Sequence, residues 1–262
     1  MGLAAYGGRD YVDRFRKLVH LMPDGRYKVD MAYFSYDRYG QIQPFKEKFY
    51  AEFGAPRKPG EEITQRHRDI ACGLQAMLEE CVIHIIRGLE AQVETRNLVM
   101  VGGVALNCVS NARVIAETSF KRLWVPPSAS DSGTPLGAAL WHWHQDLGHD
   151  RTFELTHAYW GRTPTDKEMV QALDCAGVRH KRLPEGELIA RTARDIAAGK
   201  IVGWYQGRCE IGPRALGNRS ILADPRRADP EGRGRPRPFR PAAQRRRAAR
   251  PRIAGAGRRH PV

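Results

Sequence analysis

One long segment of the chain, residues 61–96, has apolar side chains at helical spacing. The repeated positions are Ile70, Leu74, Met77, Leu78, Cys81, Val82, Ile85, Ile86 and Leu89. Two acidic residues, Glu61 and Glu62, open the segment and suit the positive end of a helix dipole. Gly73 and Gly88 lie inside it, where we expect a bend or the close approach of a neighbour. The pattern predicts a long helix that packs along a large core.

Short apolar runs and helical patterns alternate along the rest of the chain. Residues 98–101 form a wholly apolar run, which is typical of a strand buried on both faces. The patterns predict further strands at 27–36, 123–125, 178–183 and 201–205, helices at 11–22, 106–119, within 131–147, at 166–176 and at 185–198, and a loop at 207–225. This alternation predicts an α/β layered fold, with a second unit beginning near residues 150–162.

The positive charge of the chain is concentrated at its end. The 262 residues have a formal net charge of +14, but residues 226–262 alone contain 13 Arg and two acids, with 6 Pro and 4 Gly. The preceding residues are nearly neutral, with 30 basic and 27 acidic side chains. We expect this tail to be disordered, because it has few apolar residues to bury. Its composition also suggests a GC-rich gene read in a shifted frame.

Other features of composition indicate a cytoplasmic protein. No run approaches the about 20 apolar residues that cross a bilayer, and the N-terminus lacks the pattern of a signal peptide. The five cysteines form no CxxC pair and are expected to be reduced thiols: Cys72, Cys81, Cys108, Cys175 and Cys209.

Two of the strand-to-helix connections have residues suited to ligand binding. Gly102 and Gly103 follow the apolar run 98–101, so backbone N–H groups at the next helix start would attract a phosphate; a plain tight turn is the alternative. Asp131 follows the 123–125 run and either caps the next helix or binds a hard metal ion. From the residues alone the cap is favoured.

A third segment, residues 207–220, is rich in Gly and Arg. Arg214 and Arg219 have the planar guanidinium groups that bind phosphate or carboxylate, and Asn218 and Ser220 add short polar groups beside them. The alternative is a solvated loop with incidental arginines. Three clustered histidines, at positions 142, 144 and 149, are better explained by packing or surface placement than by a metal site.

Together these segments resemble the NodU/CmcH-type O-carbamoyltransferases. The matching stretches are MGLAAYG at residues 1–7, GGVALN at 102–107, the PP…D.G…GAA pattern at 124–139 and GKIVGWYQGRCEIGPRALGNRSILADP at 199–225. The resemblance implies that residues 1–155 are the C-terminal part of an ASKHA (actin/Hsp70-like) domain. It implies that residues 156–225 are the start of a YrdC-like α/β domain, which leaves residues 226–262 as the basic tail.

The resemblance also implies a reaction and its residues. Carbamoyl phosphate and ATP would give carbamoyl-adenylate, and the carbamoyl group would pass to a hydroxyl of a natural product or a nodulation-type glycan. Arg214 and Arg219, with Asn218 and Ser220, would hold carbamoyl phosphate. Nucleotide would bind at Gly102, Gly103, Val104 and Asn107, and Asp131 would bind a divalent metal, Fe²⁺ or alternatively Mg²⁺.

Two further expectations concern the extent and the partners of the chain. Family members are considerably longer, and the upstream metal-binding histidine pair is missing, so we expect a fragment. The alternatives are an inactive remnant whose arginine tail binds nucleic acid without specificity, and a relative that transfers threonylcarbamoyl to tRNA. The family implies a homodimer, with neither a membrane nor a specific nucleic acid as partner.

Overall fold

The computed structural model describes residues 2–226, which form two compact units. Among the described residues, unit 1 consists of 2–97 and 107–122, and unit 2 of 98–106 and 123–226. The tail that we expect to be disordered lies outside the described residues, apart from Arg226 at its start. Unit 2 includes residues on both sides of the boundary predicted at residue 155, and the ASKHA and YrdC-like assignments stay predictions.

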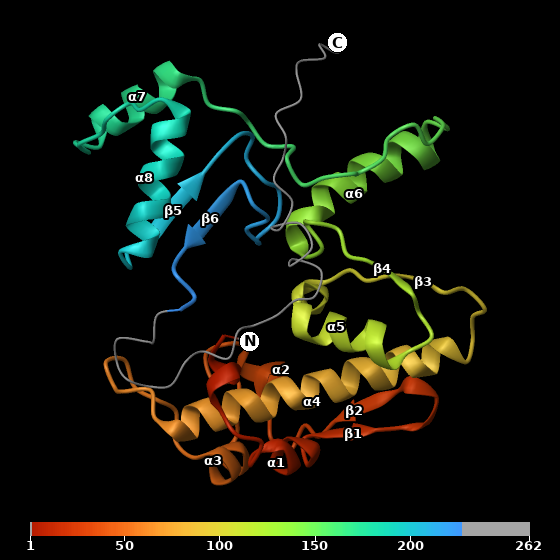
Figure 1. The fold of residues 1–262 in the computed structure, drawn as a ribbon. Helices are drawn as coiled ribbons and strands as arrows, with labels where there is room; N and C mark the ends of the chain where they lie inside the picture. The colour runs from red at the N-terminus through yellow and green to blue at the C-terminus, as the bar shows by residue number, and fades with distance from the viewer. Residues whose placement is uncertain (1, 227–262) are drawn as a thin grey trace. The chain divides into compact units, whose positions relative to one another are not determined.

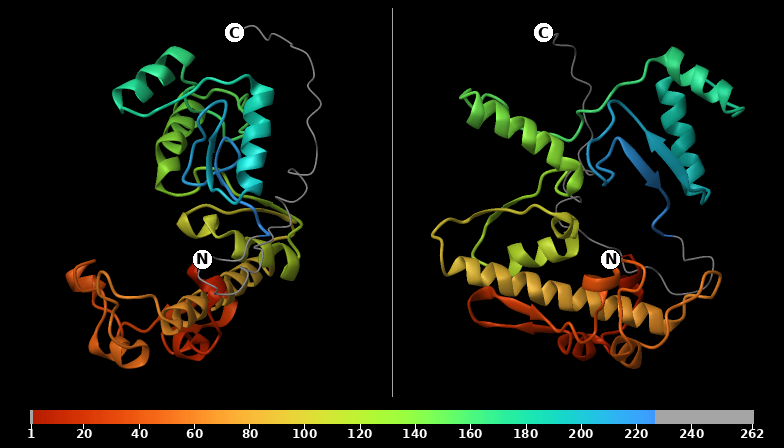
Figure 2. Two further views of the ribbon diagram at one scale, coloured as in Figure 1. Left: turned by 60° about the vertical axis from the view of Figure 1, so that its left-hand side comes forward. Right: turned by 180° about the vertical axis from the view of Figure 1, so that it is seen from behind.

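Unit 1 is built around one long helix (Figure 1). Its elements are η1 (Leu3–Tyr6), α1 (Val12–Arg16), β1 (Val19–Leu21), η2 (Pro23–Gly25), β2 (Tyr27–Val29), α2 (Tyr36–Tyr39), α3 (Glu47–Phe53), α4 (Gln65–Glu90) and α5 (Cys108–Glu117). The 26-residue helix α4 lies between α5 and the β1–β2 hairpin (Figures 1 and 2). The predicted long helix is therefore confirmed, with its ends inside the 61–96 segment.

The N-terminus of α4 is stabilised by a different interaction from the one predicted. Glu61 and Glu62 precede the helix, and its first turn has no acidic residue. Instead, Thr64 and His67 form a capping box, in which the Thr64 N–H donates to His67 Nδ1 at 3.0 Å. A side chain that satisfies a free backbone N–H thus replaces the expected interaction with the helix dipole.

The two glycines of α4 allow close approach, one of the two expected outcomes. A Cβ at Gly88 would lie 2.5 Å from the Cα of Gly25, in the turn of the β1–β2 hairpin. A Cβ at Gly73 would lie 2.9 Å from the Cβ of Tyr11. The hairpin is antiparallel, with Val19 opposite Val29. The predicted helix at 11–22 is wrong in its second half, because Val19 pairs in this hairpin.

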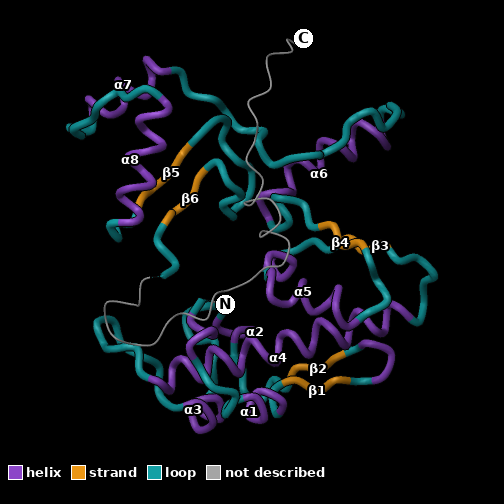
Figure 3. Tube along the Cα trace, in the orientation of Figure 1, coloured by secondary structure: helices purple, strands orange, loops and turns teal. Residues whose placement is uncertain are grey.

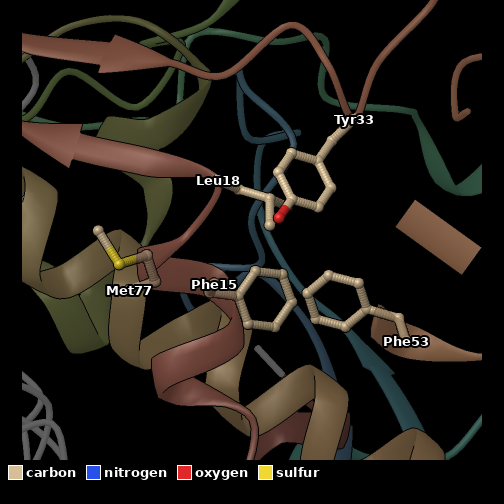
Figure 4. Packing of buried hydrophobic residues seen from close by; sticks show 5 residues of the cluster. All are labelled: Phe15, Leu18, Tyr33, Phe53 and Met77. Carbon is tan, nitrogen blue, oxygen red and sulfur yellow. The ribbon is translucent and has the colours of Figure 1, made fainter. Parts of the chain in front are cut away.

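The core of unit 1 is a cluster of buried side chains from several of these elements (Figure 4). It comprises Phe15, Leu18, Tyr33, Phe53 and Met77. The ring centroids of Phe15 and Phe53 are 4.6 Å apart, and those of Phe49 and Phe53 are 4.5 Å apart. Aromatic contacts at these separations add to the stabilisation from burial alone.

Unit 2 combines short strands with shorter helices (Figure 3). Its elements are η3 (Gly103–Leu106), η4 (Asp131–Gly133), α6 (Thr134–Trp141), the π-helical turn η5 (His142–Asp146), α7 (Asp166–Cys175), α8 (Glu185–Ala197), β5 (Val202–Tyr205) and β6 (Arg219–Leu222). β3 (Asn97–Val99) and β4 (Arg122–Trp124) begin in unit 1 and continue into unit 2. β3 pairs with β4, and β5 pairs antiparallel with β6.

Three sequence expectations for unit 2 need correction. β3 is not buried on both faces, since Val99 is 61% exposed. The segment 178–183 forms no strand, because no described strand pairs with it. The predicted loop 207–225 contains β6, in which Arg219 pairs with Tyr205. The second and third outcomes depend on pairing between distant segments, and the first depends on which elements cover the strand; local pattern specifies neither.

The described residues have a mixed composition of helices and small sheets, in agreement with the predicted α/β class. Among residues 2–226, no helix combines the length and the apolar character needed to cross a membrane.

Candidate functional site

The glycine turn after β3 has one strained position and an open surface. Gly102 has a φ of +91°, which favours glycine, and its N–H donates to the Ala129 carbonyl at 2.6 Å. A Cβ at Gly102 or Gly103 would meet no atom within 4 Å, so the backbone is open to a ligand there. The helix expected directly after the glycines begins later, because η3 precedes α5. Val104 is exposed on η3.

Asn107 is held by unit 1 rather than by this turn. Its side-chain oxygen accepts a hydrogen bond from the Ser110 N–H at 3.2 Å and so caps α5. Its amide also exchanges two hydrogen bonds with the Gln75 amide, at 2.9 and 3.2 Å. With only 6% of the residue exposed, Asn107 has a structural role, and its predicted contact with nucleotide stays a prediction.

Asp131 begins the short turn η4 just before α6. No side-chain hydrogen bond caps η4 or α6, so the carboxylate does not serve as a helix cap. The turn itself is tight, since a Cβ at Gly133 would lie 2.1 Å from the Ser128 carbonyl oxygen. Asp131 is exposed, and no hydrogen bond or ion pair engages its side chain within the described residues.

Gly102 and Asp131 line one pocket of unit 2, with a volume of about 520 Å³. Its other walls come from the end of β4 and from α6, with Phe153 and Leu155. Most of the lining residues are apolar, and the polar side chains among them include Ser128, Ser130, Asp131 and Thr134. A pocket of this size suits a small organic ligand whose orientation is set by a few polar groups.

The arginine-rich segment 207–220 folds around one buried carboxylate, Glu210, with residues 207–218 as a loop and Arg219 and Ser220 in β6. Glu210 Oε1 accepts hydrogen bonds from the backbone N–H groups of Leu216, at 2.9 Å, and Asn218, at 2.8 Å. Its other oxygen, Oε2, lies 3.2 Å from Arg219 Nε. The Glu210 side chain is 0% exposed, so this loop is organised around an internal ion pair.

The predicted anion-binding side chains differ in the hydrogen bonds that they already make within the protein. Arg219 Nη2 donates to the carbonyl oxygens of Gly212 and Arg214. The Asn218 side chain donates to the Arg208 carbonyl at 2.8 Å. Arg214 is exposed and donates one long hydrogen bond, 3.4 Å, to the Leu106 carbonyl. Arg214 therefore has the more available guanidinium group of the two predicted arginines.

Arg219 and Ser220 also line a second pocket of unit 2, of about 420 Å³, on the β5–β6 hairpin. Trp204, Tyr205 and Ile221 complete much of its wall. A hydrogen bond with Cys209 raises the pKa of the Tyr205 phenol above its ordinary value of 10.0. The Tyr205 hydroxyl therefore remains a neutral donor at physiological pH.

Three segments that are distant in the sequence meet within unit 2. Arg214 reaches the end of the glycine turn at Leu106. Gly212 packs directly on the Pro127 carbonyl, in the segment that leads to Asp131. The structure thus brings the 102–106, 126–131 and 207–220 segments together, whereas Asn107 belongs to unit 1.

No group of three or more His, Cys, Asp and Glu side chains among residues 2–226 is arranged to hold a metal ion. Asp131 alone does not build such a site. The clustered histidines have other contacts: His142 Nδ1 lies 2.8 Å from Asp146 Oδ2, and the His149 ring stacks on Trp143. The described residues therefore do not fit a complete metal centre.

Glu210 is the residue of this site that the sequence analysis missed. It is the one acidic residue between Arg208 and Arg219. A carboxylate close to several arginines in a loop indicates an internal ion pair. The same carboxylate can also accept hydrogen bonds from backbone N–H groups, which in a loop lack the partners that a helix or sheet supplies. Its burial, however, follows from tertiary packing.

Two protein-family profiles match the chain. "Carbamoyltransferase N-terminus" matches residues 1–140, and "Carbamoyltransferase C-terminus" matches residues 193–250. An uncharacterised protein of Synechocystis sp. is 40% identical over 86% of this chain and 38% of its own length. Nodulation protein NolO of Bradyrhizobium diazoefficiens is 37% identical over 89% of this chain and 41% of its own length.

A relative with a named activity matches a shorter part. The 3'-hydroxymethylcephem-O-carbamoyltransferase of Streptomyces clavuligerus is 36% identical over 47% of this chain and 22% of its own length. The chain spans about two fifths of the length of the first two relatives.

Proposed function

The chain belongs to the carbamoyltransferase family, and from this we propose that it forms part of an O-carbamoyltransferase. The proposed enzyme uses carbamoyl phosphate, ATP and water to form carbamoyl-adenylate, with release of phosphate and pyrophosphate. It then transfers the carbamoyl group to a hydroxyl of a natural product or a glycan, with release of AMP. The proposal includes the finer assignment of the chain to parts of an ASKHA-type and a YrdC-like domain.

The observation that supports this function is the meeting of three segments within unit 2. The backbone at Gly102 is open to a ligand. Arg214, from the segment 207–220, donates a hydrogen bond to the Leu106 carbonyl at the end of the same turn. A backbone that a ligand can approach closely and a guanidinium group are both suited to phosphate oxygens. Reactants that bear phosphate, such as ATP and carbamoyl phosphate, match this combination.

The proposed roles of the side chains follow from their hydrogen bonds and their exposure. Arg214 binds the phosphate group of carbamoyl phosphate, and its fixed charge stabilises the phosphate as it leaves. Ser220 lines a pocket next to Arg219, and its proposed role is to donate a hydrogen bond to the same anion. Gly102 and Gly103 let the nucleotide approach the backbone closely. A divalent metal bound by Asp131 would need ligands beyond the described residues, so no step is assigned to it.

The proposal is tested by the affinity of the full chain for carbamoyl phosphate, measured by titration calorimetry at constant ionic strength. Arg214→Ala should weaken binding by about tenfold or more, the loss expected for a charge-assisted hydrogen bond. Arg194→Ala is the matched control, because it removes an exposed arginine of α8 in the same unit. Equal affinities for the two variants would contradict the role of Arg214.

A further inference from the structure

Glu210 closes the loop that contains Arg214. Its Oε1 accepts the N–H groups of Leu216, at 2.9 Å, and Asn218, at 2.8 Å, and so joins the start of the loop to its end. Backbone N–H groups in a loop have no ladder or helix to satisfy them. One carboxylate therefore determines the path of the chain on both sides of Arg214.

The charge of Glu210 is balanced by Arg219. Arg219 Nε lies 3.2 Å from Glu210 Oε2, a buried oxygen that receives no hydrogen bond within residues 2–226. The same guanidinium group donates through Nη2 to the carbonyls of Gly212 and Arg214. Arg219 thus supports the loop from inside, and its charge is partly neutralised by Glu210.

We infer that Glu210 is a positioning residue, which acts through Arg219 and the two backbone N–H groups to present Arg214 to an anionic substrate. The inference rests on the proposed function, in which this loop binds carbamoyl phosphate. It assigns the two arginines different tasks: Arg214 contacts the substrate, and Arg219 supports the loop. The negative charge of Glu210 opposes an anion, so the favourable effect of Glu210 on binding comes from ordering the loop.

The test uses the full chain and compares Glu210→Gln, Glu210→Ala and the control Glu187→Gln. Glu187 is an exposed glutamate of α8, whose Oε1 lies 4.0 Å from Lys181 Nζ. All three variants remove one negative charge from unit 2. The measurements are the dissociation constant for carbamoyl phosphate, its salt dependence, and amide hydrogen exchange at Leu216 and Asn218.

Positioning and simple charge predict opposite results. Loss of a negative charge near Arg219 would tighten anion binding if Glu210 acted by charge alone. A positioning residue predicts weaker binding, by about threefold for Glu210→Gln and about tenfold for Glu210→Ala. Glu187→Gln should bind at least as well as the unaltered chain. Unchanged or tighter binding in both Glu210 variants would overturn the inference.

Hydrogen exchange separates this inference from the proposed function. Glu210→Ala should accelerate exchange at Leu216 and Asn218 by about tenfold or more, whereas the amide oxygen of Glu210→Gln should keep most of the protection. Should the alanine variant fail to fold, the glutamine variant decides. If the unaltered chain does not bind carbamoyl phosphate, the proposed function fails, and exchange still decides whether Glu210 holds the loop. Unchanged exchange in Glu210→Ala would refute the positioning role.

Discussion

Gly212 lies so close to Pro127 that a Cβ at position 212 would be 1.9 Å from the Pro127 carbonyl oxygen. This contact joins the segment 207–220 to the segment that leads to Asp131. Gly212 also has a φ of +86°, which side chains rarely adopt. The position therefore requires glycine for two independent reasons, space and backbone conformation.

Gly212→Ala should destabilise unit 2 by about 1–3 kcal/mol, because the strained φ and the clash both oppose the native loop. Denaturant unfolding measures the change. Gly186→Ala is the control, since a Cβ there meets no atom within 4 Å and its φ is not positive. That control should leave stability unchanged or raise it by up to about 1 kcal/mol, because alanine favours the helix. Equal effects of the two variants would show that the loop does not rest on Pro127.

Gly88→Ala should destabilise unit 1, because the added methyl group displaces the turn of the β1–β2 hairpin from α4. A Cβ at Gly88 would lie 2.5 Å from the Gly25 Cα and 2.7 Å from the Asp24 carbonyl oxygen. Backbone atoms cannot move aside as a flexible side chain does, so we expect a loss of about 1–3 kcal/mol in unfolding free energy. A neutral result, measured beside Gly186→Ala, would contradict the close approach.

Phe15→Ala should be among the most damaging substitutions in unit 1. Phe15 is 6% exposed and contacts Phe53, which is 3% exposed. Removing a buried phenyl ring leaves a cavity, which typically costs about 3–5 kcal/mol. Denaturant unfolding tests this value, with Tyr39→Ala as a control at an aromatic residue that is 58% exposed. A loss below that of the control would argue against the cluster in Figure 4.

Glu90 should make the stability of unit 1 depend on pH in the acidic range. Its carboxylate accepts a hydrogen bond from the Ser119 N–H, which lowers the pKa of Glu90 below its ordinary value of 4.5. A lowered folded-state pKa means that the stabilisation is present above pH 4.5 and is lost as the pH falls through the folded-state value.

Glu90→Gln tests this dependence by unfolding at several pH values. The variant should be less stable than the unaltered chain at pH 7, and the difference should shrink below pH 4.5. Glu94→Gln is the control, because it removes the same charge from an exposed glutamate nearby in the sequence. A difference that persists at low pH would assign the effect to packing instead.

Local pattern predicted the helices better than the strands. The apolar spacing that predicts a helix at 166–176 is confirmed by α7, where Thr165 and Glu168 form a capping box. Helical hydrogen bonds join residues four apart, so nearby side chains determine them. β6 was missed because the Gly- and Pro-rich composition continues around it, while its partner β5 begins 17 residues before it. The segment 178–183 has a strand-like pattern but lacks a neighbour.

The family motifs, the residue types suited to phosphate and the long helix α4 can all be read from the amino-acid sequence. The shared pocket of Gly102 and Asp131, the Asn107 cap of α5 and the burial of Glu210 against Arg219 follow from tertiary packing alone. Residue chemistry and helical spacing are local properties of the chain. Contacts between distant segments depend on how their backbones pack, and burial of a charge is stable only where that packing supplies its partners.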